Sequence, residues 1–158
     1  MGLSNPYTFT KFTVISPTGR TCGTVGEFVI TGDGYDVQWC AIGDPTDWPT
    51  PATDDARAKQ SGKQTMINRF GVVTGIAGND FFGYVFQETA ITKMTYVGGD
   101  VVFRFDTFEE QRGCHAYNRY EEVDDKVFFE SRQGYHLLED GQVLDLGFGK
   151  VDVSFTPQ

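Results

Sequence analysis

Short runs of alternating apolar and polar residues, separated by glycine-rich polar turns, recur along most of the chain. The first clear pair of runs covers residues 27–31 and 35–42, on either side of the turn Gly32-Asp33-Gly34. Runs that alternate with period two and are bounded by Gly, Asp or Asn predict antiparallel strands joined by tight turns. This region is therefore expected to form a β-hairpin.

Two later stretches each contain four such runs in series. The first has runs at 71–77, 81–87, 90–96 and 101–105, and the second at 120–123, 127–131, 135–139 and 143–146. Four short antiparallel strands joined by polar turns correspond to one blade of a β-propeller. We therefore predict an all-β fold of antiparallel four-stranded meanders, as in propeller blades.

The hairpins suggest a repeat. When the units are aligned on them, three dipeptides take equivalent positions: Gly34-Tyr35, Thr89-Ala90 and Gly134-Tyr135. Their recurrence at roughly 45 to 55 residues matches one blade per period. The blades are expected at about 24–48, 65–108 and 114–155, within a single β domain spanning 1–158.

The alternating pattern disappears between the first two units. Residues 49–64 are rich in Pro, small and charged residues, and a loop of that length in a compact domain is usually functional or disordered. We predict a long contact or flexible loop there. Basic residues lie in and just after it, at Arg57, Lys59, Lys63 and Arg69. They are candidates for contacting DNA, for pairing with an acidic neighbouring subunit, or for plain solvation.

Three blades are too few for a closed propeller, which needs at least four. The chain is then an incomplete propeller or a fragment of a longer one, or its sheets are completed by neighbouring copies, or the units pack as a sandwich. Residues 147–155 are expected either to close a sheet or to form one short turn of helix. We predict a homo-oligomer from the missing blades and the long loop.

Composition supports the prediction of an all-β fold and argues against some classes of function. Aromatic residues make up 15% of the 158 residues and there are 19 Gly, which suits half-buried sheets and frequent turns. The chain shows no membrane-length apolar run and no signal-peptide pattern, so we expect a soluble protein made in the cytoplasm, without membrane insertion. The net charge of −9 disfavours specific nucleic-acid binding, although weak repulsion would suit a wall past which DNA moves.

The segment Asp44-Pro45-Thr46-Asp47-Trp48 has the composition of a turn. Asp44 can bond its own backbone and Pro45 fixes φ, which leaves Trp48 as a large amphipathic side chain. Trp48 is interpreted either as part of a turn that closes a blade or as a subunit contact or sugar platform. The candidate contact residues are therefore Trp48, Asp44, Arg57, Lys59 and Lys63.

No catalytic or metal site is expected. Neighbouring acidic residues on a strand point to opposite faces, so the acidic pairs are poor glycosidase dyads. Neither His115 nor His136 is expected beside a nucleophile, and no phosphate-binding or dinucleotide-binding glycine motif is present. Cys22, Cys40 and Cys114 are too widely spaced for a zinc site and are expected to be reduced structural thiols. We therefore predict a protein that is not an enzyme and has no cofactor.

The segment from Cys40 to Trp48 reads Cys-Ala-Ile-Gly-Asp-Pro-Thr-Asp-Trp. It is similar to the Ser-Ala-Ile-Gly-x-Pro-x-Asp-Trp segment in the blades of a family of tailed-bacteriophage and prophage virion proteins, with Cys40 where Ser is usual. Further segments follow in the order of that family, at 101–105, 113–116, 128–135, 140–142 and 149–152. The chain resembles the propeller-bearing tail hub or packaged-DNA stabilisation proteins of short-tailed phages over about residues 25–155.

The resemblance implies a structural virion protein of the tail or neck, as a hub or nozzle component, assembled in the cytoplasm of the bacterial host. Its implied partners are portal, adaptor and other tail proteins, together with further copies of the chain. The alternative function is a receptor-binding or glycan-binding β module of a phage tail that uses an exposed Trp39 or Trp48.

Overall fold

The computed structural model describes residues 19–147, which form three antiparallel sheets of four strands each. The all-β prediction is confirmed. The first sheet contains β1 (Thr21–Val25), β2 (Phe28–Asp33), β3 (Asp36–Trp39) and β4 (Gly62–Thr65). The second contains β5 (Val73–Gly78), β6 (Phe82–Gln87), β7 (Ile91–Gly98) and β8 (Val102–Glu109). The third contains β9 (Tyr120–Val123), β10 (Lys126–Ser131), β11 (Gly134–Glu139) and β12 (Gln142–Gly147).

Each sheet is a meander in which consecutive strands are neighbours. The dipeptides Gly34-Tyr35 and Thr89-Ala90 lie in the connection between the second and third strands of their sheets, whereas Gly134-Tyr135 begins the third strand, β11. Gly34 has a positive φ of 60°, a conformation that costs glycine little, and its turn joins the paired residues Asp33 and Asp36. The equivalence inferred from sequence therefore holds for the first two dipeptides and is wrong by two residues for the third, where Arg132 and Gln133 form the connection.

The first sheet differs from the prediction because it has four strands instead of a hairpin and extends to residue 65. The stretch 49–64, expected to be a loop, contains the short helix α1 (Asp54–Ala58) and most of β4. Thr53 caps α1, its side chain accepting a bond from the N–H of Ala56 at 3.1 Å. β4 shows no apolar alternation because it is an edge strand with mostly exposed side chains, held through backbone pairing with β3.

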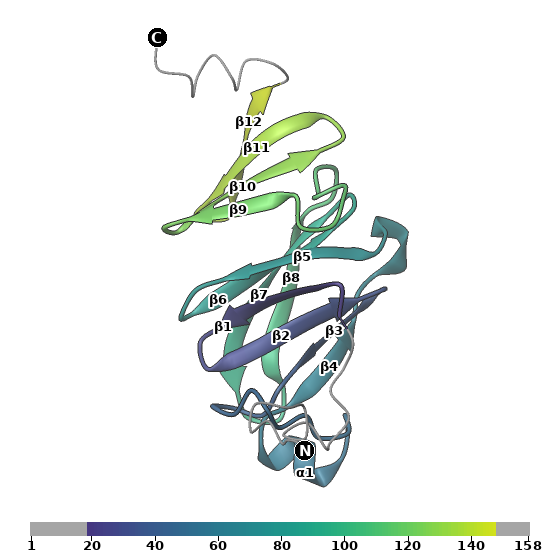
Figure 1. The fold of residues 1–158 in the computed structure, drawn as a ribbon, viewed down its shortest axis with the longest axis vertical. Helices are drawn as coiled ribbons and strands as arrows, with labels where there is room; N and C mark the ends of the chain where they lie inside the picture. Colours follow the sequence, from purple (N-terminus) through teal and green to yellow (C-terminus); the bar gives the residue numbers. More distant parts are fainter. Residues whose placement is uncertain (1–18, 148–158) are drawn as a thin grey trace, which may run out of the picture.

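The second sheet lies in the middle of the molecule, with the first sheet on one face and the third on the other (Figure 1). Side chains on β6 alternate between the two interfaces: Val85 faces the first sheet, whereas Tyr84 and Phe86 face the third. Because both of its faces are covered, β6 is almost wholly buried.

Two cores fill the interfaces between the sheets. The core between the first and second sheets contains Val25, Phe28, Ile30, Val37, Trp39, Met66, Val73, Ile76, Val85, Met94, Val102 and Phe103. The core between the second and third contains Ala77, Tyr84, Phe86, Ile91, Cys114, Val127, Phe129 and Leu138.

The first strands of neighbouring sheets approach each other closely through glycines. A Cβ added to Gly23 on β1 would lie 2.5 Å from the carbonyl oxygen of Ile76 on β5. The hydroxyl of Tyr120, at the start of β9, donates to that same carbonyl at 2.6 Å. β1 and β5 therefore pack closely, and the Tyr120 side chain joins β9 to β5.

Bulky rings separate the later strands. Trp39 on β3 packs against Phe103 and Phe105 on β8, with ring centroids 5.1 and 6.0 Å apart. Residues 19–147 therefore form an open stack of three blade-like sheets.

The predicted closing segment at 147–155 lies outside the described residues, except for Gly147, which ends β12. The same applies to the end of the third blade, predicted to reach residue 155. Within residues 19–147, no helix has the length and apolarity needed to cross a bilayer.

Candidate functional site

His136 lies between Ser131 and Asp145 in the third sheet. Its Nε2 is 2.5 Å from the Ser131 Oγ, and its Nδ1 is 2.8 Å from the Asp145 Oδ1. The strand register explains this cluster, because His136 on β11 pairs with Phe129 on β10 and with Asp145 on β12. Side chains of paired residues share one face of a sheet. The expectation that neither histidine lies beside a nucleophile is therefore wrong for His136.

The hydrogen-bond partners of His136 indicate which of its ring nitrogens donates and which accepts. The Asp145 carboxylate accepts the Nδ1–H of His136, which leaves Nε2 to accept the hydroxyl proton of Ser131. The Ser131 Oγ in turn accepts the backbone N–H of Gln133 at 2.9 Å. This connectivity is the one that activates serine in Ser-His-Asp hydrolases.

Burial decides against catalysis by this cluster. Ser131 is 4% exposed and His136 2% exposed, and both side chains point from the third sheet toward the second. An attacking serine must reach a substrate carbonyl beside donors that stabilise the oxyanion, and this hydroxyl faces the protein interior. We therefore interpret the cluster as a structural network that joins β10, β11 and β12.

Arg112 extends this network toward the second sheet. Its guanidinium donates to Asp145 at 2.6 Å and to Glu109, the last residue of β8, at 2.8 Å. Its hydrogen bond holds the pKa of the Asp145 carboxyl below its usual value. Burial lowers the pKa of His136, and this effect outweighs the opposing one of the Asp145 carboxylate. At neutral pH, His136 is therefore uncharged and Asp145 ionised.

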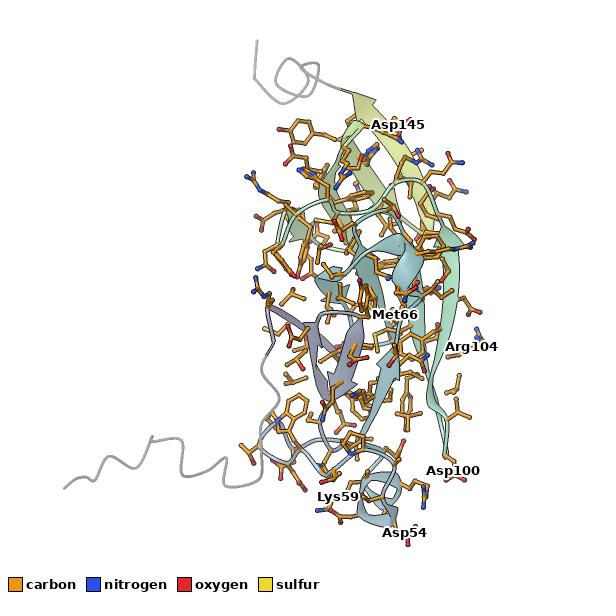
Figure 2. All side chains as sticks on the ribbon, turned by 90° about the vertical axis from the view of Figure 1, so that its right-hand side faces the viewer. Asp54, Lys59, Met66, Asp100, Arg104 and Asp145 are labelled. Atoms are coloured by element: carbon orange, nitrogen blue, oxygen red, sulfur yellow. The ribbon has the colours of Figure 1, made fainter. Side chains whose placement is uncertain are left out.

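The candidate contact residues Arg57, Lys59 and Lys63 lie at the other end of the molecule. Figure 2 shows Lys59 and Asp54 at the opposite end from Asp145. Each base is paired with a carboxylate of this chain: Arg57 with Asp54, Lys59 with Asp47 and Asp55, and Lys63 with Asp36. Such exposed pairs contribute about 0–1 kcal/mol each. Contact between these bases and another molecule stays a prediction.

Asp44 and Trp48 form the turn that the sequence predicts. Asp44 Oδ1 accepts from the backbone N–H and the hydroxyl of Thr46, at 3.0 and 2.6 Å, and these bonds lower the pKa of Asp44. Trp48 is 4% exposed, and its Nε1 donates to the carbonyl of Pro45 at 2.8 Å. Trp39 is equally buried and donates to the carbonyl of Gln60. The expectation of an exposed tryptophan that could bind a sugar is wrong for both.

The cysteines fit the structural interpretation. Cys22, Cys40 and Cys114 are free thiols, of which Cys40 and Cys114 are buried. Burial raises the pKa of both buried thiols, so the reactive thiolate is disfavoured. No group of three or more His, Cys, Asp or Glu side chains is placed to hold a metal ion within residues 19–147.

The outward face of the third sheet is mixed in chemistry. It carries the apolar and aromatic residues Val123, Phe128, Tyr135, Leu137, Leu144 and Leu146, together with the charged residues Glu121, Lys126, Glu130 and Glu139. Val123 is 47% exposed and Leu144 48% exposed. A shallow hollow of about 250 Å³ lies against this face, lined in part by Phe128, Tyr135 and Leu146.

The outward face of the first sheet is mostly polar. This polar end face consists of Thr24, Val29, Thr31, Gln38, Lys63 and Thr65. It resembles an ordinary solvated sheet face, whereas the outward face of the third sheet carries more exposed apolar side chains, Val123, Tyr135 and Leu144 among them.

No protein-family model and no curated protein matches the chain. The resemblance to phage virion proteins stays a prediction from the sequence.

Proposed function

We propose that this chain is a non-enzymatic structural component of a tailed-phage virion, located in the tail or neck and acting by assembly with other virion proteins. The observation that carries the proposal is the open stack of three blade-like antiparallel sheets. Val123, Tyr135 and Leu144 on the outward face of the third sheet are 47%, 40% and 48% exposed, and exposed apolar side chains beside well-packed sheets are typical of a protein that contacts partners.

The chemistry of the described residues supports assembly over turnover. The Ser131-His136-Asp145 network resembles a catalytic triad in its hydrogen bonds, but its serine and histidine are buried between two sheets. The same burial argument applies to glycan binding, because Trp39 and Trp48 are both covered. Neither an enzyme nor a tryptophan-based glycan module is favoured by a specific observation.

The phage assignment is supported by the order of the similar sequence segments and by the agreement of their turns with the fold. The segment from Cys40 to Trp48 forms a compact connection after β3, and 128–135 spans the hairpin of β10 and β11. Turns and core aromatics are the features that a structural module must keep. The proposed partners are portal, adaptor and tail proteins, and the net charge of −9 suits a surface that does not retain passing DNA.

The test is to look for the chain in purified particles. Antibody raised against the recombinant chain is used to probe phage particles induced from the encoding strain and purified on a density gradient. We expect the chain to copurify with the particles and the antibody to label their tail or neck in electron micrographs. An abundant host protein from the same lysate serves as the contamination control. A chain that stays in the soluble fraction while tailed particles form normally would refute the proposal.

A further inference from the structure

We infer that a pocket between the first and second sheets binds an arginine side chain of a partner protein. This inference rests on the proposed assembly function and specifies one surface and the chemistry of its partner. The pocket has a volume of about 270 Å³, which suits a single side chain better than a larger ligand. Its lining includes Gly26, Glu27, Phe28, Ile42, Asp80 and Tyr96.

Backbone hydrogen bonds fix the loops around the pocket relative to one another. The N–H of Gly26 donates to the carbonyl of Asn79 at 2.9 Å, which joins the β1–β2 turn to the β5–β6 turn. The N–H of Gly43 donates to the carbonyl of Glu27 at 3.0 Å, which joins the β1–β2 turn to the connection after β3. The side chain of Asn79 accepts two further backbone N–H bonds within its own turn. A side chain that enters a pocket with fixed walls loses little free energy to the ordering of loops.

Two carboxylates of the pocket have no counter-ion. Glu27 and Asp80 are both exposed. Among residues 19–147, neither forms an ion pair with a base, and none of the residues that line the pocket is basic. A cation that enters therefore meets two negative charges and displaces no existing ion pair.

The aromatic wall of the pocket suits a guanidinium group. The rings of Phe28 and Tyr96 lie with their centroids 5.6 Å apart, and Tyr96 is the accessible one, at 40% exposed. The hydroxyl of Tyr96 donates to the Gln60 Oε1 at 2.6 Å, which holds the ring in place. A planar guanidinium stacks on an aromatic ring and still has N–H donors for two carboxylates, whereas an ammonium group is a compact point charge. Ile42 offers apolar surface to the methylene stem of the same side chain.

The surroundings of the pocket favour a protein partner over a free small cation. Asp80 is followed directly by Phe81, which is 76% exposed, and Tyr96 by Val97, which is 48% exposed. Exposed apolar side chains next to a pocket can pack against the neighbours of an inserted side chain and exclude water from it. We therefore expect the partner to present its arginine between apolar residues.

The test is a nuclear magnetic resonance titration of the isotope-labelled full chain with the peptide N-acetyl-Leu-Arg-Leu-amide. The peptide is added up to about 20 mM, and we expect the amide signals of Gly26, Ile42 and Asp80 to shift with a Kd on the order of 1 mM. The same peptide with citrulline in place of arginine keeps the shape and lacks the charge. It should bind about tenfold more weakly, because it loses the ion pairs and the cation–π contact.

Variants of the pocket assign the binding to its residues. Glu27→Gln and Asp80→Asn should each raise the Kd about threefold, as the loss of one exposed ion pair predicts. Asp33→Asn is the matched control, because Asp33 is an exposed carboxylate at the other end of β2, and it should leave the Kd unchanged. Tyr96→Leu should weaken binding and Tyr96→Phe should not, since only the first removes the ring.

Four outcomes would overturn the inference. The first is the absence of shifts at the pocket at the highest peptide concentration, and the second is a citrulline peptide that binds as tightly. The third is ethylguanidinium binding as tightly as the peptide, which identifies the occupant as a free small cation. The fourth is a shift of the same signals with protein concentration alone, which identifies it as a second copy. Failure of peptide binding would leave the virion proposal intact, whereas absence of the chain from purified particles would refute that proposal and leave the pocket.

Discussion

A substitution at Gly23 tests the close packing of the first two sheets more directly than the truncation of a large core side chain. A Cβ at this position would lie 2.5 Å from the backbone oxygen of Ile76, where an ordinary contact is at least 3.4 Å. The two strands would have to separate by about 0.9 Å, and overpacking of this kind costs about 1–3 kcal/mol. Alanine also removes up to about 1 kcal/mol of the entropic cost of glycine. Gly23→Ala should therefore destabilise the fold by a net of about 1–2 kcal/mol.

The assay is urea and thermal unfolding followed by circular dichroism. A net loss of that size lowers the Tm by roughly 2–8 °C for a domain of this length. Gly23→Val should cost more than Gly23→Ala, since it adds volume at the same point. Thr24→Val is the matched control, because the neighbouring side chain is exposed and should change stability by less than about 0.5 kcal/mol. A Gly23→Ala protein as stable as the unchanged chain would refute the close approach of β1 and β5.

Three further predictions concern the second interface, the histidine and the thiols. Leu138→Ala removes a fully buried side chain between the second and third sheets and should cost about 2–5 kcal/mol in urea unfolding. The pKa of His136 is lower in the folded chain, so the unfolded chain binds a proton more readily and the free energy of unfolding should fall as the pH drops below about 6.5. Urea unfolding at pH 7.5 and 5.5 should show this loss in the unchanged chain and not in His136→Gln. A pH dependence that the substitution leaves unchanged would contradict the assignment. In the native protein a maleimide should label Cys22 quickly and Cys40 and Cys114 slowly, and in urea all three should react alike.

The sequence predicts most of the fold because each hairpin has its own local signal. Apolar alternation and turns such as Gly34-Tyr35 identify the strands of the second and third sheets and the central hairpin of the first. β1 was not predicted because Thr21–Val25 is short and contains a glycine needed for contact with β5. β4 was not predicted because an edge strand with exposed polar side chains shows no alternation of apolar and polar residues.

The candidate sites were less predictable, because they depend on register and on contacts between sheets. Ser131 and His136 are five residues apart and become neighbours only when the turn between β10 and β11 sets the pairing. Once that hairpin and β12 are aligned, the same face holds Asp145, so an explicit register could have revealed the network. The burial of Trp39 and Trp48 has no comparable local signal, since it depends on residues from β8 and from the connection after β3.

The most direct test of the stacked arrangement is a nuclear Overhauser experiment on the isotope-labelled chain. We predict cross-peaks between the Gly23 α protons and Ile76, and between the Tyr120 ring and the Gly75 α protons, because these pairs join the first strands of consecutive sheets. If the expected cross-strand peaks within each sheet are present and both of these inter-sheet contacts are missing, the three blades do not stack in this order.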